Sequence, residues 1–238
     1  MKRRPVLSPE VSRNLTQGTS LQGVAEFEIK NGWIEHLTVV APELTGCSLR
    51  RLGDEDCDAL YSFYTAGLSP TSRVLFPPYP LFKPWPVSAD ELWGRLQQWR
   101  AESDWTVMCL WIEETIRGVG LLKRLSASPT TGLSTDETVR GRGFGTLIQR
   151  VLMWQALLQG VALLRVTVAP ENSASMALHR RCGYLDTGRT VPHTLQLPSG
   201  EAVTRDDVEM EVRLEECDWL DPFRSSAMSQ PSQERQHR

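Results

Sequence analysis

The sequence lacks the features that mark membrane, secreted and nucleic-acid-binding proteins. No apolar run approaches the roughly 18 residues that a membrane span needs. The basic start at residues 1–4 is followed by Pro5 and polar residues, where a signal peptide would continue with a long apolar run. The formal net charge of −3 provides no overall cationic field for nucleic acid or an anionic membrane. We therefore expect a cytoplasmic protein that has neither nucleic acid nor a membrane as a partner.

Signals for metal and disulfide sites are also missing. The 5 cysteines are scattered and odd in number, and none belongs to a Cys-x-x-Cys pair of the kind that builds zinc or redox sites. We expect no metal and ordinary reduced thiols. Cys182 lies near the candidate active region described below, and we interpret it as a small, buried packing residue.

The composition is that of a folded protein with extensions at both ends. The 238 residues are 40% hydrophobic and 23% charged, close to globular averages. Residues 1–46 form an N-terminal extension with a β-hairpin, because Phe27 and Ile29 alternate with charged residues and Asn31-Gly32 supplies a two-residue turn. A main domain is expected over 47–216, and the Ser/Gln/Arg-rich tail 217–238 is expected to be disordered.

The periodicity of the main domain predicts an α/β (α+β) fold with a mixed sheet flanked by helices. Antiparallel strands come first and a strand–helix–strand–helix–strand section follows. Strands are expected at 48–51, 105–112, 116–125, 131–135, 161–168, 184–189 and 208–214. Helices are expected at 54–66, 88–101, 144–159 and 172–182.

Three alternating glycines stand between an expected strand and an expected helix, in the string Arg140-Gly141-Arg142-Gly143-Phe144-Gly145-Thr146. Without Cβ atoms, glycines allow successive backbone N–H groups to turn toward one anion, and a helix start adds partial positive charge. Arg140 and Arg142 can add charge-assisted contacts. The string fits neither the P-loop nor the dinucleotide fingerprint. A diphosphate site is one interpretation, and a glycine-rich turn used only for packing is the other.

A second string about 30 residues downstream favours the diphosphate. It reads Asn172-Ser173-Ala174-Ser175-Met176-Ala177-Leu178-His179-Arg180-Arg181-Cys182-Gly183-Tyr184. Together the two strings resemble the GCN5-related N-acetyltransferase (GNAT) family, whose motifs are Arg/Gln-x-x-Gly-x-Gly/Ala and Asn-x-x-Ala-x-x-Leu-Tyr-x-x-x-Gly-Phe. Arg140, Gly143 and Gly145 match the first motif. Asn172, Leu178 and Gly183 match the second, with Tyr184 in place of Phe and Ser175 in place of Ala.

The resemblance implies a mostly antiparallel sheet whose central parallel strands splay apart to admit the pantetheine arm of acetyl-CoA. It implies that the backbone of Leu133, Ser134 and Thr135 pairs with pantetheine, and that Gly141, Arg142, Gly143, Phe144, Gly145 and Thr146 hold the pyrophosphate. Asn172 would contact the cofactor beside the thioester. A helix N-cap is the alternative role for this asparagine.

The catalytic acid and base are harder to place by resemblance. His179 stands where many members have the tyrosine that protonates the departing CoA thiolate, and a histidine could take over that role or simply pack. The carboxylate that often serves as base falls at about Ala127 here. Glu113 and Glu137 are the candidate replacements, with Glu114 and Asp136 nearby, and ordered water is a further alternative.

The acceptor groove of the family is built by regions that correspond here to the segment 69–85 and to an expected loop over 190–205. The first holds prolines interleaved with aromatic residues, which could form a stiff apolar wall or merely cover the core. The leading hypothesis is an acetyl-CoA-dependent N-acetyltransferase acting on a small-molecule or protein amine. A non-catalytic CoA-binding or sensor module, and less favourably an interaction protein, are the alternatives. Neither the acceptor nor the oligomeric state can be read from the sequence.

Overall fold

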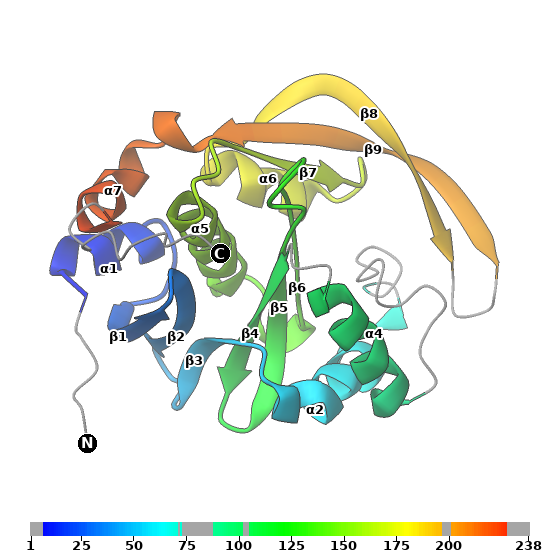
Figure 1. The fold of residues 1–238 in the computed structure, drawn as a ribbon, viewed down its shortest axis with the longest axis horizontal. Helices are drawn as coiled ribbons and strands as arrows, with labels where there is room; N and C mark the ends of the chain where they lie inside the picture. Colours follow the sequence, from blue (N-terminus) through cyan, green and yellow to red (C-terminus); the bar gives the residue numbers. More distant parts are fainter. Residues whose placement is uncertain (1–6, 71, 73–87, 102–104, 197–200, 228–238) are drawn as a thin grey trace, which may run out of the picture.

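One mixed β-sheet runs through the computed structural model, which describes residues 7–70, 72, 88–101, 105–196 and 201–227 (Figure 1). Within these residues the sheet has 9 strands in the order β1-β2-β3-β4-β5-β6-β7-β9-β8. The strands are β1 (Gly23–Lys30), β2 (Trp33–Val40), β3 (Cys47–Arg51), β4 (Trp105–Ile112), β5 (Thr115–Lys123), β6 (Thr130–Thr135), β7 (Leu163–Val168), β8 (Leu185–Gln196) and β9 (Ala202–Arg213). All neighbours are antiparallel except β6 and β7, which confirms the mixed sheet expected from the sequence.

Helices cover both faces of this sheet. They are α1 (Pro9–Thr16), α2 (Cys57–Ser62), α4 (Ala89–Ala101), α5 (Phe144–Leu158), α6 (Ser173–Arg181) and α7 (Asp221–Ala227). Shorter turns are η1 (Asp54–Asp56), the π-helical η2 (Phe63–Gly67), η3 (Glu137–Val139), η4 (Leu214–Glu216) and η5 (Asp218–Leu220). Of the helices in the described ranges, none is long and apolar enough to cross a membrane.

The alternation of side chains along a strand divides the apolar residues between two cores. On β4, Met108 and Leu110 join the core beneath α5, whereas Val107 and Cys109 join the core beneath α2 and α4. Figure 1 shows α2 and α4 together on the side of the sheet away from α5 and α6. Because β4 is buried on both faces, its sequence reads as a continuous apolar run rather than an alternating one.

The parallel strands β6 and β7 meet only at their amino ends. Thr130 pairs with Arg165, and the Arg165 N–H donates to the Pro129 carbonyl at 3.0 Å. No pairing between the two strands is present further along, among the residues that the structure describes. The strands therefore diverge toward Thr135 and Val168 and leave a wedge that opens at their carboxyl ends.

The N-terminal hairpin is confirmed, and it extends the main sheet. β1 and β2 pair around Asn31-Gly32, and β2 continues into β3 through the pair Leu37–Leu49. The helix α1 was not expected from the sequence. Its Val11 and Leu15 are buried one helical turn apart, which a mostly polar segment of this length signals only weakly.

The expectation of a disordered tail from residue 217 is wrong for the part of the tail that the structure describes. Residues 218–220 form η5 and 221–227 form α7. Leu220 and Phe223 are fully buried, and the Phe223 ring packs on Trp154 of α5 at 4.7 Å between centroids. Two buried apolar residues, Leu220 and Phe223, therefore anchor this segment, despite the polar composition around them. Residues 228–238 lie outside the described part.

The second acceptor region was expected to be a loop over 190–205, and this is also wrong. β8 and β9 run on as a long antiparallel hairpin through the pairs Thr190–Val208 to Gln196–Ala202, and Figure 1 shows it arching away from the sheet. β-Branched residues on both strands, among them Val191, Thr194, Val203 and Thr204, favour the extended backbone here. The first acceptor region, 69–85, is described only at 69, 70 and 72, so the expected aromatic wall lies outside the described residues.

Candidate functional site

The glycine loop between β6 and α5 has the backbone conformation that its sequence predicts. Gly141 and Gly143 have φ values of 74° and 90°, in the region that glycine occupies without strain. Gly143 is the N-cap of α5, and as a glycine it has no side chain to accept a hydrogen bond from the first turn. The loop therefore leaves the start of a 15-residue helix without a cap.

The backbone N–H groups of Gly143, Phe144, Gly145 and Thr146 have no hydrogen-bond acceptor among the described residues. The next N–H, of Leu147, donates to the Gly143 carbonyl at 3.1 Å and begins the regular helix. Such a cluster of free donors at the positive end of a helix dipole binds an anion. This observation favours the diphosphate interpretation over a turn that serves only for packing.

The two loop arginines differ in their surroundings. Arg140 is turned back onto β6, where it donates to the Thr135 carbonyl at 3.0 Å and to Ser72 Oγ at 2.8 Å. It also pairs with Glu137 at 3.4 Å. Arg142 is exposed. Of the two charges, that of Arg142 is the one free to turn toward an anion at the helix start.

Glu137 serves as an ion-pair partner in this loop. Its Oε1 accepts from Ser72 Oγ at 2.7 Å and from the Ser69 N–H at 3.4 Å. Desolvation raises the pKa of this carboxyl, but the hydrogen bonds from Ser69 and Ser72 and the charge of Arg140 outweigh it and lower the pKa to about 2. A carboxylate that holds a proton so weakly is a poor general base near neutral pH.

Glu113, the other candidate base, lies away from the wedge. It occupies the turn between β4 and β5 with φ of 55°, and its N–H donates to the Gly46 carbonyl at 3.2 Å. The end of β6 is in register with Gly118, because Gly118 pairs with Thr135. Glu113 thus lies beyond the start of β5, more than about 10 Å from that register along the strand direction.

The strand β6 leaves its backbone unpaired along the edge that faces the wedge. Ser134 is only 5% exposed, yet its Oγ has no partner among the described residues. On the opposite face, Leu133 contacts the core beneath α5. The backbone of Leu133, Ser134 and Thr135 is paired with β5 on one side, and on the other it faces the gap left by β7. A bound chain could pair with this free edge as an additional strand.

Asn172 caps α6 at the other side of the wedge. Its Oδ1 accepts from the Ser175 N–H at 3.1 Å, which confirms the N-cap alternative. The cap fixes the side chain where β7 gives way to α6, directly after the diverging end of β7. Its Nδ2 group is not used by the cap and can donate a hydrogen bond to a ligand.

His179 is buried about two turns further along α6, with 2% of its surface exposed. Its Nδ1 lies 2.8 Å from the Ser175 carbonyl oxygen, which can only accept, so Nδ1 carries the proton in the neutral ring. Nε2 is buried without a partner among the described residues. Burial lowers the pKa of His179 to about 4, against an opposing effect of the Ser175 carbonyl. Near neutral pH, Nε2 therefore carries a lone pair and cannot donate a proton.

A buried polar network behind the wedge was not found from the sequence. Gln149 of α5 donates to Tyr184 Oη at 2.8 Å and to Thr131 Oγ1 of β6 at 3.1 Å, and the Tyr184 ring packs edge-on against His179. In the sequence, Gln149 lies among the apolar residues of α5. Nothing in that pattern indicates that its side chain points inward. The network ties β6, α5 and α6 together.

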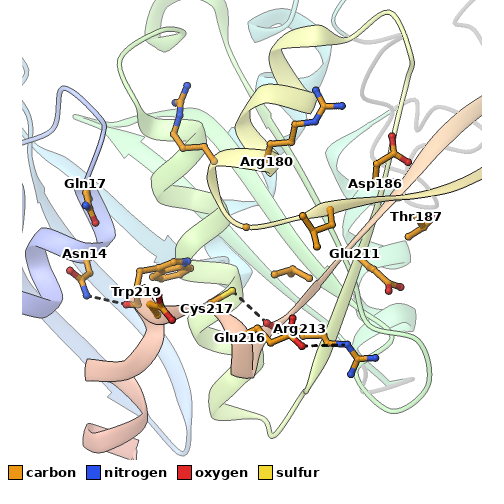
Figure 2. A pocket seen from close by; sticks show the side chains of 15 residues that line it. Asn14, Gln17, Arg180, Asp186, Thr187, Glu211, Arg213, Glu216, Cys217 and Trp219 are labelled. Carbon is orange, nitrogen blue, oxygen red and sulfur yellow. Dashed lines mark hydrogen bonds and ion pairs between the residues drawn. The ribbon is translucent and has the colours of Figure 1, made fainter.

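A separate cavity of about 800 Å³ lies elsewhere (Figure 2). Its lining includes Arg180 at the end of α6, Glu211 on β9 and Trp219 on η5. Because Glu211 pairs with Arg165, this cavity is at the amino end of β7, opposite to the carboxyl end where the wedge opens. Within the described ranges, no group of three or more His, Cys, Asp or Glu side chains is placed to hold a metal ion.

Comparisons with known proteins agree with this geometry. Residues 47–185, more than half of the chain, match the family model for the acetyltransferase (GNAT) domain. No curated protein sequence matches the chain significantly. The chain belongs to the GNAT acetyltransferase family, and the matched residues extend from β3 to the first residue of β8.

Solved structures share the fold at low sequence identity. Spermidine N-acetyltransferase from Vibrio cholerae, in complex with CoA and spermine, is 18% identical with a TM-score of 0.58, over 74% of this chain and 98% of that one. The ribosomal-protein-S5-alanine acetyltransferase from Vibrio fischeri is 13% identical with a TM-score of 0.58, over 74% and 97%. The structure of yncA from Salmonella typhimurium with its cofactor acetyl-CoA is 17% identical with a TM-score of 0.53, over 73% and 97%.

The resemblance stated from the sequence is thus confirmed, as are the expected fold and the co-substrate. The protein is an acetyl-CoA-dependent N-acetyltransferase of the GNAT family. The free N–H groups at the start of α5 and the open edge of β6 suit the two parts of CoA that such an enzyme must hold, a diphosphate and a chain of amides.

Proposed function

We propose that this enzyme holds acetyl-CoA in the wedge between β6 and β7, with the pyrophosphate on the N–H groups of residues 143–146. The cluster of free donors at the mouth of a splayed parallel pair is the observation that carries this assignment. The pantetheine amides pair with the backbone of Leu133, Ser134 and Thr135. Asn172 Nδ2 contacts the cofactor near the thioester while its Oδ1 continues to cap α6.

In the proposed reaction the neutral amine of the acceptor attacks the thioester carbonyl carbon directly. A backbone N–H at the wedge stabilises the developing oxyanion. The C–S bond then breaks, CoA leaves as the thiolate, and the amine nitrogen loses its proton to water. The favoured base is ordered water, because Glu137 is held by Ser72 and Arg140 and Glu113 lies beyond the start of β5.

His179 does not serve as the acid in this proposal. The Ser175 carbonyl fixes the proton on Nδ1, and burial keeps the ring neutral near pH 7. We expect the thiolate to leave without a protein proton donor at this position, which is feasible because a thiolate is a weak base. His179→Asn, which keeps a donor toward Ser175, should retain kcat within about threefold of the parent.

The acceptor is an amine, and the names of two structural neighbours suggest which amines to try first. One neighbour is a spermidine N-acetyltransferase, and another is a ribosomal-protein-S5-alanine acetyltransferase. A panel should therefore include polyamines, peptides with an N-terminal alanine and lysine peptides. Release of the CoA thiol is followed on mixing acetyl-CoA with each amine. Acceptor-dependent release identifies the substrate class. CoA binding without release across the panel would instead indicate a non-catalytic CoA-binding module.

A further inference from the structure

Two residues from outside the matched family region contact the glycine loop. They are Thr19 and Ser20, in the segment between α1 and β1, whereas the family model begins at residue 47. Ser20 Oγ donates to the Arg142 carbonyl oxygen at 2.7 Å. The Thr19 side chain lies against Gly143, so close that a Cβ at position 143 would be 2.3 Å from Thr19 Cβ.

The hydrogen bond from Ser20 orients the peptide group that joins Arg142 and Gly143. In a trans peptide the carbonyl and the N–H point in opposite directions. Because Ser20 holds the Arg142 carbonyl, the N–H of Gly143 points away from the N-terminal segment. That N–H is the first of the free donors at the start of α5. Ser20 therefore sets the direction of one donor in the proposed pyrophosphate site.

Glycine is needed at position 143 for two reasons. One is its φ of 90°, and the other is the contact with Thr19. The threonine side chain fills the space that a side chain at 143 would occupy. Thr19 is itself fixed, because its Oγ1 donates to the Thr16 carbonyl at 2.6 Å and accepts from the Leu21 N–H at 3.2 Å. The contact is thus between two ordered turns.

A buried arginine holds the whole segment against the helix that follows the loop. Arg150 of α5 is 4% exposed and donates to the carbonyls of Asn14, Leu15 and Gln17 at 3.0, 3.1 and 2.8 Å. These carbonyls end α1, where they have no partners within the helix. The segment and the loop are consequently fixed to the same helix, α5, on which the proposed site depends.

From these contacts we infer that Thr19 and Ser20 are positioning residues for CoA, through which the N-terminal segment fixes the backbone of the pyrophosphate loop. The inference rests on the proposed function of that loop. It assigns to Thr19 and Ser20 a part in cofactor affinity, beyond their contribution to the stability of the fold. The effect should be confined to the pyrophosphate, because Ser20 bonds to the Arg142 carbonyl and Thr19 packs on Gly143, and both of these residues belong to the pyrophosphate loop.

The test compares Ser20→Ala with Ser8→Ala in the full chain. Ser8 Oγ caps α1 by accepting from the Val11 N–H at 3.3 Å, so the control removes a serine hydroxyl from the same segment without touching the loop. Calorimetric titration measures the Kd of CoA and of pantetheine, which lacks the pyrophosphate. For Ser20→Ala we expect the Kd of CoA to rise about threefold to tenfold, the range for one hydrogen bond, and that of pantetheine to stay unchanged.

Three results would overturn the inference. They are an unchanged Kd of CoA in Ser20→Ala, an equal rise in Ser8→Ala, and an equal loss for CoA and pantetheine. If Ser20→Ala folds poorly, Thr19→Ser provides a second variant. It removes only the methyl group that packs against Gly143, and we expect a rise of about twofold to threefold for CoA alone. Failure of the parent protein to bind CoA would instead contradict the proposed function itself.

Discussion

Protonation of His179 should make the stability of this protein depend on pH in a defined window. The ring is buried and neutral, and burial lowers its pKa from 6.5 to about 4. Between these two values the unfolded chain binds a proton at this position and the folded chain does not. The contribution of the neutral His179 ring to the free energy of unfolding is therefore fully present above about pH 6.5 and is lost as the pH falls toward 4.

The magnitude follows from the size of the pKa shift. Each unit corresponds to about 1.4 kcal/mol, so the difference between 6.5 and about 4 lowers the free energy of unfolding by about 3 kcal/mol from pH 7 to pH 4. The physical origin is the cost of charging an imidazole whose Nε2 has no partner in a buried site. This is a large fraction of the stability of an ordinary domain.

The assay is urea unfolding at pH 7 and pH 4 for the parent protein and for His179→Asn. Other groups also titrate in this range, so the quantity of interest is the difference between the two proteins. We expect the variant to lose about 3 kcal/mol less than the parent. Tyr184→Phe is the control, since it removes a buried hydroxyl in contact with the same ring and should weaken the protein equally at both pH values. An identical pH-dependent loss in His179→Asn and the parent would refute the reasoning.

Three further predictions concern the frame around the site. Gly120→Ala places a Cβ 2.4 Å from Ile148 Cγ2 and should cost about 1–3 kcal/mol in urea unfolding, whereas no destabilisation would show that α5 can move off β5. Arg150→Met should lower the free energy of unfolding by about 3 kcal/mol, because three carbonyls lose a charged donor. It should also make α1 sensitive to limited proteolysis, and resistance equal to that of the parent would contradict this. Glu137→Gln should keep kcat within about threefold, and a hundredfold loss would identify Glu137 as the base.

The sequence predicted the fold well where local signals and tertiary structure agree. Asn31-Gly32 specifies its hairpin by itself, and the glycines at 141 and 143 adopt the positive φ that only glycine takes at little cost. The glycine loop before α5 and the start of α6 could be placed for this reason. Asn172 belongs to the same class, because an N-cap is fixed by its own helix.

The parts that could not be predicted depend on contacts between distant segments. Nothing in the neighbourhood of Ser20 indicates that it bonds to Arg142, which is 122 positions away in the chain. The burial of Phe223 likewise depends on its contact with Trp154, which is distant in the chain. The tautomer of His179 is set by the Ser175 carbonyl in the folded helix, and residue type alone cannot reveal this. For this reason we propose that His179 is not the catalytic acid.

The central claim is that the N–H groups at the start of α5 hold the pyrophosphate of acetyl-CoA. Calorimetric titration of the parent protein with 4′-phosphopantetheine and with pantetheine tests it most directly, because the two ligands share the pantetheine arm and differ only in the phosphate that would lie at the start of α5. We expect 4′-phosphopantetheine to bind at least about thirtyfold more tightly, equivalent to roughly 2 kcal/mol from charge-assisted hydrogen bonds. Equal affinity for the two ligands would contradict the account.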